Sequence, residues 1–146
     1  MAGSASDYLE NAMLALVFNN SNIANMGDAT GVRGSTGVGS FYIALFTTVC
    51  TDAAPGTETV YTNYTRTPLA RTTGGFAISG TTPTKALNVA TVSFPPCGAT
   101  GATIVAFAIM DALTGGNMLY YGTCSLAVST AITPNFPAGS LEIDLD

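Results

Sequence analysis

The sequence predicts a mainly β protein: a single antiparallel β-sandwich, or a barrel-like variant of it, with one N-terminal α-helix. Three observations support this prediction. Short apolar segments rich in β-branched and aromatic residues recur along most of the chain, separated by turns rich in Gly, Pro and Thr. Only one segment, near the N-terminus, has apolar residues at helical spacing. The length of 146 residues suits one domain, expected over residues 1–146.

The N-terminal segment is expected to form a helix over about residues 5–18. Ser4 and Asp7 have the spacing of a capping box, and the acidic residues Asp7 and Glu10 suit the positive end of a helix dipole. The apolar residues of this segment recur every three or four positions and therefore share one face: Leu9, Ala12, Met13, Leu16 and Val17. This face either packs on the sheet or docks on a partner.

A glycine-rich loop is expected over residues 25–40, between the helix and the first strand. Five glycines fall within this stretch. It does not match a phosphate-binding loop, because no Gly-Lys-Ser/Thr follows and the loop leads into a strand instead of a helix. Two alternatives remain: a mobile surface loop, or an arm that becomes ordered against a neighbouring subunit.

Residues 41–146 are expected to supply the strands of the sandwich. The most apolar part is the hairpin Thr103–Thr123, where a Gly-Gly turn joins two segments with apolar residues at successive positions. We therefore expect both of its strands to be buried on both faces. Pro68 assigns the segment Tyr64–Ala70 to a sheet edge. The same criteria predict further strands at Phe41–Val49, Glu58–Thr62, Phe76–Ser79, Leu87–Phe94 with a bulge near Ala90, Leu126–Ile132 and Leu141–Leu145.

The composition excludes several classes of function. The formal net charge is −5, and the four Lys and Arg residues are scattered, so neither nucleic-acid binding nor binding to an anionic membrane is expected. The chain has no histidine, which removes the commonest general base and metal ligand. We expect no catalytic residue, no metal and no cofactor. Charged residues make up only 9%, and such a surface is easily covered by partners.

Three cysteines, Cys50, Cys97 and Cys124, are widely spaced and include no Cys-x-x-Cys pair. A zinc site is therefore not expected. The three are interpreted as buried free thiols, with one disulfide between strands as the alternative.

Two groups of side chains suit either a structural or a binding role. Glu142, Asp144 and Asp146 alternate along one strand face; we interpret them as solubilising residues, with glycoside cleavage and a weak calcium site as alternatives. The tyrosines are expected to serve in core and interface packing, with a carbohydrate-stacking platform as the alternative.

Five segments, in this order along the chain, resemble a family of small structural proteins of tailed-bacteriophage virions. Met1–Asn11 resembles the opening MAGS-x-SDYLEN, Phe41–Thr47 the strand YVGLYT, and Tyr64–Arg66 the motif YAR. Phe107–Gly122 resembles FGIFDA…GGNLLYWG, and Ala138–Asp146 resembles AGALTITLD. Two departures are a longer glycine-rich loop and Tyr121 in place of tryptophan.

The resemblance implies a structural virion protein and no enzyme. The expected role is that of a capsid decoration (cement) protein, made in the host bacterial cytoplasm and located on the capsid exterior. It would bind the major capsid protein and form a homo-oligomer, with a trimer favoured. The alternative is a tail- or fibre-associated protein that contacts the host surface. Partner contacts are expected on the helix and the glycine-rich loop, at Tyr8, Leu9, Met13, Leu16, Gly31, Arg33, Gly34 and Gly37.

Overall fold

The computed structural model describes residues 5–27, 31–32, 34–79 and 85–144. Within these ranges there is one helix, the sheets are antiparallel, and no sheet closes into a barrel; the predicted mainly β class with an N-terminal helix is confirmed. The chain divides into two compact units, which are described in turn. Unit 1 contains residues 1–39, 70–91 and 137–146, and unit 2 contains residues 40–69 and 92–136. The single domain over 1–146 stays a prediction.

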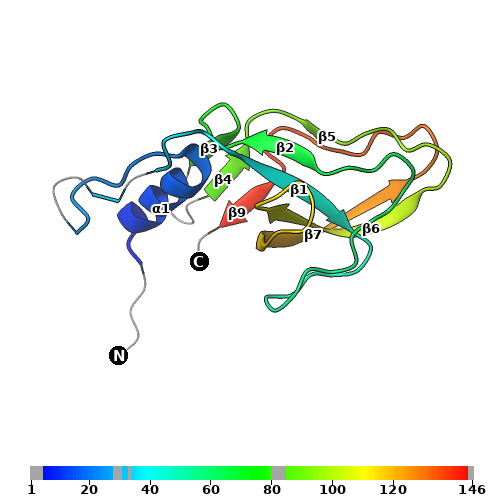
Figure 1. Ribbon diagram of the computed structural model, residues 1–146, viewed down its shortest axis with the longest axis horizontal. Coiled ribbons are helices and arrows are strands. Elements are labelled where there is room, and N and C mark those ends of the chain that lie inside the picture. Colours follow the sequence, from blue (N-terminus) through cyan, green and yellow to red (C-terminus); the bar gives the residue numbers. More distant parts are fainter. Residues whose placement is uncertain (1–4, 28–30, 33, 80–84, 145–146) are drawn as a thin grey trace. The chain divides into compact units, whose positions relative to one another are not determined.

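Unit 1 consists of one helix packed on a small sheet (Figure 1). Its elements are the helix α1 (Asp7–Asn19) and a three-stranded antiparallel sheet in the order β3-β4-β9, with β3 Phe76–Ser79, β4 Lys85–Asn88 and β9 Glu142–Asp144. The helix contacts β3 and β4. Leu14 and Phe18 are fully buried, and the ring of Phe18 lies 4.7 Å from the ring of Phe76. The helix therefore belongs to the core of unit 1.

The helix differs from its prediction in its start and in its buried face. Ser6 is the N-cap and its Oγ accepts a hydrogen bond from the Leu9 N–H, whereas the predicted cap, Ser4, lies outside the described residues. Met13 is 43% exposed. The pair Leu14 and Phe18 has the same i, i+4 spacing as the predicted stripe, but these two side chains are the fully buried ones, with the ring of Phe18 against Phe76 of β3.

Arg71 binds the C-terminal turn of the helix. The helix has no basic residue of its own in that turn. Arg71 Nε and Nη2 donate to the carbonyl oxygens of Val17 and Leu16, at 2.7 and 3.1 Å. A cation at this end complements the helix dipole and satisfies carbonyls that lack a partner within the helix.

Unit 2 contains the larger sheet (Figure 1). The four-stranded sheet has the order β2-β1-β6-β7, with β1 Ser40–Phe46, β2 Thr67–Ala70, β6 Ala102–Met110 and β7 Met118–Val128; a two-stranded sheet joins β5 Val92–Ser93 to β8 Asn135–Phe136. The edge position of the Pro68 strand is confirmed. Phe107 of β6 packs on Phe136 of β8 with ring centroids 5.4 Å apart, so the small sheet contacts the large one at this point. This is a sandwich-like arrangement within unit 2.

The prediction that both strands of the central hairpin are buried on both faces is confirmed for only one strand, β6. Residues 106–110 of β6 are buried on both faces, because β6 lies between β1 and β7. Along β7, in contrast, partly buried and exposed residues alternate up to Ala127. The prediction for β7 is wrong because this strand forms the edge of its sheet, which the apolar pattern alone did not reveal.

Three other strand predictions are also wrong. Leu87–Phe94 is not one bulged strand but β4 and β5, which belong to different sheets. Leu126–Ile132 is not a separate strand, since β7 continues to Val128. Glu58–Thr62 forms only an isolated bridge, between Glu58 and Phe46.

The alternation predicted for the last strand is confirmed within β9. Ile143 is buried, whereas Glu142 and Asp144 are exposed. Leu145 and Asp146 lie outside the described residues.

Candidate functional site

The residues predicted to contact a partner are spread over unit 1. Tyr8 and Met13 are 66% and 43% exposed, Gly37 is exposed, and Leu9 and Leu16 are half-buried. A Cβ atom at Gly31 would clash with the carbonyl oxygen of Ile23, and one at Gly34 with that of Asn20. These two glycines therefore have a structural role in addition to any contact. Arg33 lies outside the described residues, and the partner role of the whole set stays a prediction.

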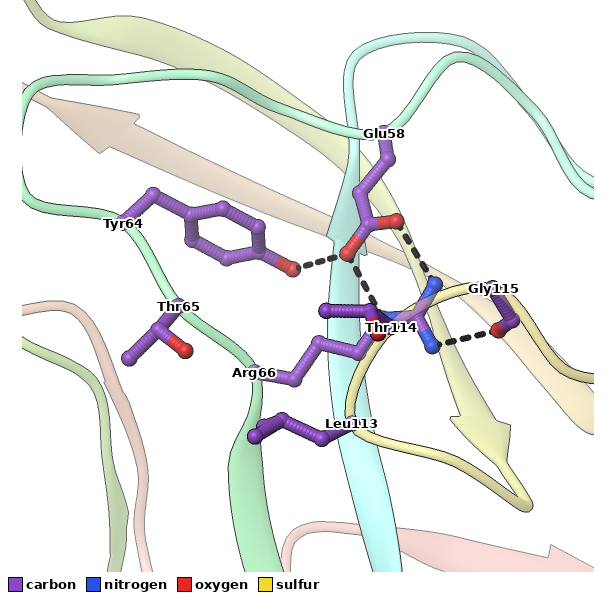
Figure 2. Close-up of a pocket in the computed structure, with 7 residues that line it drawn as sticks. All are labelled: Glu58, Tyr64, Thr65, Arg66, Leu113, Thr114 and Gly115. Atoms are coloured by element: carbon purple, nitrogen blue, oxygen red, sulfur yellow. Dashed lines mark hydrogen bonds and ion pairs between the residues drawn. The ribbon is translucent and has the colours of Figure 1, made fainter.

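The most elaborate polar arrangement lies in unit 2, where Arg66 connects Glu58 to the turn between β6 and β7. The Arg66 side chain is only 6% exposed. Its Nε and Nη2 donate to the two carboxylate oxygens of Glu58, each at 2.8 Å (Figure 2). Its Nη1 donates to the carbonyl oxygens of Ala112 and Gly115, at 2.7 and 2.8 Å. One side chain thus fixes a turn that is almost fifty residues away in sequence.

Tyr64 extends this arrangement to the sheet. Its hydroxyl donates to Glu58 Oε1 at 2.8 Å and accepts the backbone N–H of Leu45 at 3.0 Å. The Thr59 N–H donates to the carbonyl oxygen of the same Leu45. A continuous chain of hydrogen bonds therefore runs from strand β1 through Tyr64 and Glu58 to Arg66 and the turn.

The turn itself is closed by Asp111. Its carboxylate accepts the backbone N–H and the side-chain Nδ2 of Asn117, both at 2.7 Å, and these bonds lower the pKa of Asp111. Gly115 and Gly116 both have positive φ, at 61° and 74°. Asp111 is therefore a turn residue whose hydrogen-bond partner, Asn117, lies across the turn.

The charges of the site stabilise one another. Burial acts to raise the pKa of Glu58, but hydrogen bonds from Arg66 and Tyr64 outweigh it, so that the pKa is lowered. The hydrogen bonds to Glu58 raise the pKa of Arg66. Burial raises the pKa of Tyr64, which keeps its hydroxyl protonated. Glu58 and Arg66 are therefore ionised partners, and neither is poised for proton transfer.

Two shallow hollows flank the turn. One, of about 240 Å³, is lined by Glu58, Tyr64, Thr65, Arg66, Leu113, Thr114 and Gly115 (Figure 2). The other, of about 250 Å³, is lined by Asp52, Ala53, Ala54, Pro55, Gly116, Asn117 and Met118. Leu113, which lines the first hollow, is 47% exposed. The geometry offers a rigid surface for contact and no nucleophile–base pair.

Three further observations concern the chemistry of the described part of the chain. No group of three possible metal-ligating side chains occurs there. None of its helices has the length and apolar character needed to cross a membrane. Cys50 and Cys97 are buried free thiols, and Cys124 is a half-buried free thiol. Burial raises the pKa of Cys124 to about 11, so this thiol stays protonated and unreactive.

The Arg66 site was not among the residues predicted to be functional. Two signals for it were present in the sequence: the Tyr64-Thr65-Arg66 motif and the Asp111…Gly-Gly-Asn motif, both family-like. The sequence did not show that these motifs touch, because Arg66 and Ala112 are 46 positions apart. Glu58, the other partner of Arg66, carried no signal of its own.

Substitution Gly116→Ala is expected to lower the free energy of unfolding by about 2 kcal/mol, because positive φ is unfavourable for alanine. In addition, the new methyl group would collide with the Asp111 carboxylate and with Ala112 Cβ. Gly115→Ala is the matched control: φ is also positive, but no atom lies within 4 Å, so about 1 kcal/mol is expected. Urea unfolding measures both, and equal losses would contradict the proposed closeness of Asp111.

Acid is expected to weaken the fold through Glu58. Its folded-state pKa lies below the ordinary 4.5, so the unfolded chain binds a proton more readily. The resulting stabilisation is present above pH 4.5 and is lost as the pH falls through the lowered folded-state pKa. Urea unfolding at a series of pH values should show this loss, and Glu58→Gln should flatten it. An identical acid profile in the variant would refute the assignment.

The comparison with known proteins identifies the family. No curated protein matches the chain. The sequence model of one family, described as Podophage GP4 fiber I protein gp80, matches residues 4–144, which is nearly the whole chain. The resemblance to structural proteins of phage virions is thereby confirmed at this level. The chain belongs to the Podophage GP4 fiber I protein gp80 family and is a structural protein of a tailed phage.

Proposed function

We propose that this protein is a structural subunit of the phage fibre that contacts the host surface. The family match over residues 4–144 supports the proposal, because the family's description names a fibre protein of a podophage. This was the alternative to a capsid decoration role in the sequence-based prediction. The contact surface is the turn between β6 and β7, where Arg66 binds the backbone on either side of the exposed Leu113, which lines one of the hollows.

The geometry of the turn suits such a surface. A loop that must bind repeatedly loses less entropy on binding when it is already fixed. The turn at residues 111–117 is fixed at three points: by Asp111 and Asn117 across its base, and by Arg66 on two of its carbonyl oxygens. Arg66 and Glu58 form most of their hydrogen bonds with each other and with groups of the same protein. The exposed side chains of the turn that a partner can contact are therefore Leu113 and Thr114.

Immunogold labelling of intact virions tests the location. Antibodies against the purified chain should label the fibres, while antibodies against the major capsid protein, the control, should label the shell. Label on the shell alone would overturn the fibre proposal. Absence of label after partial disruption of the virions would overturn any virion location.

A capsid decoration protein is the second candidate. The small fraction of charged residues, 9%, suits a protein whose surface is covered by a capsid lattice. In that case the major capsid protein is the partner and the protein is a trimer on the capsid exterior. The test is to add the purified chain to shells that lack it: saturation at a fixed number of copies supports decoration, and no binding contradicts it.

A further inference from the structure

We propose that the hollow beside Arg66 binds one neutral sugar residue of a host-surface saccharide. This inference rests on the proposed function, in which the turn between β6 and β7 contacts the host surface. The hollow measures about 240 Å³ and includes three residues of that turn in its lining (Figure 2). Pockets for drug-sized ligands measure about 300–1,000 Å³. The hollow is smaller, and so it suits a single sugar ring better than an extended ligand.

Arg66 and Glu58 leave one donor and one acceptor for a ligand. The Arg66 guanidinium forms four hydrogen bonds, two with the Glu58 carboxylate and two with carbonyl oxygens of the turn. One N–H of its Nη2 therefore has no partner among the described residues. Glu58 Oε1 accepts from Arg66 and Tyr64, whereas Oε2 accepts from Arg66 alone. Oε2 can therefore accept a further hydrogen bond.

A hydroxyl group of a ligand fits this pair of atoms. Arg66 Nη2 and Glu58 Oε2 are hydrogen-bonded to each other at 2.8 Å, so their unused positions are adjacent. One hydroxyl can accept from Nη2 and donate to Oε2 at the same time, because it is both a donor and an acceptor. An ammonium group has only donors and a carboxylate only acceptors, so neither can form both bonds. The pair is thus matched to an alcohol.

The other side chains that line the hollow suit the rest of a sugar ring. Thr65 and Thr114 are exposed and supply two hydroxyls, which can bond to further hydroxyls of the ring. Leu113, also exposed, supplies an apolar surface for the C–H groups of the ring. A few polar groups beside an apolar surface are the usual composition of a small-molecule site. A pyranose ring carries both kinds of group and therefore complements this lining.

The charges around the hollow favour a neutral sugar over an acidic one. The Arg66 cation is already neutralised by the bidentate contact with the Glu58 carboxylate. The pKa of Arg66 is raised by its hydrogen bonds to Glu58 and also by the charge of Asp111, which places a second carboxylate in the vicinity. An acidic sugar would therefore meet two carboxylates and a cation that is already paired.

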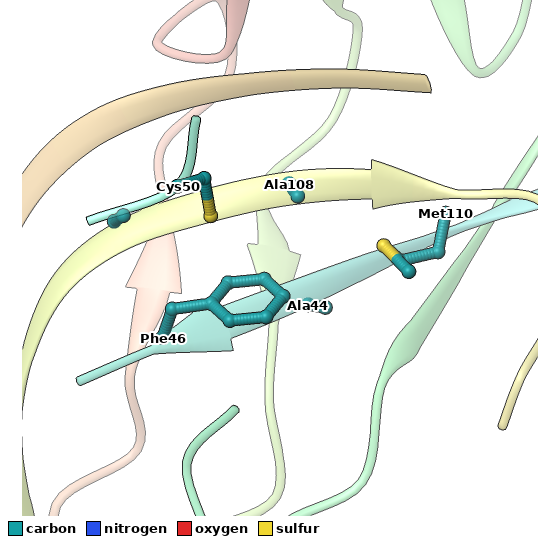
Figure 3. Close-up of a cluster of buried hydrophobic side chains, with 6 residues drawn as sticks. Ala44, Phe46, Cys50, Ala108 and Met110 are labelled. Carbon is teal, nitrogen blue, oxygen red and sulfur yellow. The ribbon is translucent and has the colours of Figure 1, made fainter. Parts of the chain in front are cut away.

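The hollow is fixed before a ligand binds. The Tyr64 hydroxyl accepts a hydrogen bond from Leu45 of β1, and Glu58 forms a bridge with Phe46 of the same strand. β1 pairs with β6, which leads into the turn. A buried cluster holds these strands together (Figure 3); its members are Ala44, Phe46, Cys50, Ala106, Ala108 and Met110. A preformed site needs little ordering on binding, which favours the capture of a small ligand.

Nuclear magnetic resonance titration of the isotope-labelled full-length chain tests the site. The probes are the methyl glycosides of glucose, galactose and mannose, with methyl glucuronide as the acidic probe. At least one neutral glycoside should shift the amide signals of residues 113–115, with a dissociation constant of about 1 mM for so small a ligand. The glucuronide should bind about tenfold more weakly, because its carboxylate is repelled by Glu58 and Asp111.

Two variants of the turn connect binding to the hollow. Thr114→Val and Leu113→Ala should each weaken binding about fivefold, because the first removes a hydrogen bond and the second an apolar contact. Both residues are exposed, so neither variant should unfold. Thr73→Val, in an exposed turn of unit 1, is the matched control for Thr114→Val and should bind as the unmodified chain does.

Three outcomes would overturn the saccharide site: no shift at residues 113–115 with any neutral glycoside, tighter binding of the glucuronide, or unchanged affinity in Thr114→Val. The location of the protein in the virion is a separate result. Immunogold label on the fibres without sugar binding would overturn the saccharide site alone. Sugar binding with label on the shell alone would overturn the fibre proposal and leave the saccharide site in place.

Discussion

Substitution Arg66→Met is expected to lower the free energy of unfolding by about 3 kcal/mol, because it leaves the Glu58 carboxylate without its partner. The estimate is at the lower end for a buried pair since the Glu58 side chain is 31% exposed and water can solvate it in part. Two carbonyl oxygens of the turn, those of Ala112 and Gly115, lose their donor at the same time. Urea unfolding followed by circular dichroism measures the change.

The control for this prediction is an ion pair that is exposed. Lys85 and Glu142 pair across β4 and β9 with side chains 31% and 40% exposed. Lys85→Met should therefore cost less than about 1 kcal/mol. Arg66→Lys should recover only part of the stability, because one ammonium group cannot reproduce the bidentate contact and reach both carbonyl oxygens. Equal losses at Arg66 and Lys85 would contradict a structural role for the buried pair.

Substitution Phe18→Ala is expected to destabilise unit 1 by about 3–5 kcal/mol, the range for removing a buried aromatic side chain. Phe18 is fully buried, and its ring packs on Phe76 of β3. The loss combines the apolar area returned to water with the cavity that remains. Hydrogen exchange should show faster exchange first in α1 and in the β3–β4 pair, and thermal unfolding should give the size of the effect.

Met13→Ala on the same helix is the matched control, since Met13 is 43% exposed, and a change within about 0.5 kcal/mol is expected. A truncation that removes residues 1–18 would delete both Leu14 and Phe18, and it is therefore expected to unfold unit 1 instead of only removing a docking surface. Similar effects of Phe18→Ala and Met13→Ala would contradict the packing of the helix on the sheet.

Several elements followed from local sequence. The helix could be predicted because its apolar residues have helical spacing and a serine precedes an acidic first turn. Strand β3 was predicted with its observed bounds, and β9 was recognised from strict alternation. Pro68 identified an edge strand because proline lacks the backbone N–H that a central strand needs.

The sequence-based predictions were wrong where the burial of one segment depends on the segment packed against it. Leu14 and Phe18 have no better spacing than the predicted stripe, and only the presence of Phe76 decides which face is buried. Nothing local distinguishes the buried strand β6 from the exposed strand β7, because both are apolar and their burial depends on the order of strands in the sheet.

The Arg66 site likewise depends on segments that are distant in the sequence. Composition determined that this protein has few charges and no histidine, and the family-like motifs indicated a structural phage protein. Only the tertiary structure decided that Arg66 is used internally, because the energy of a buried arginine depends on which oxygen atoms surround it, and these come from Glu58, Ala112 and Gly115. Such contacts between distant residues are set by the packing of the whole sheet and cannot be inferred from spacing along the chain.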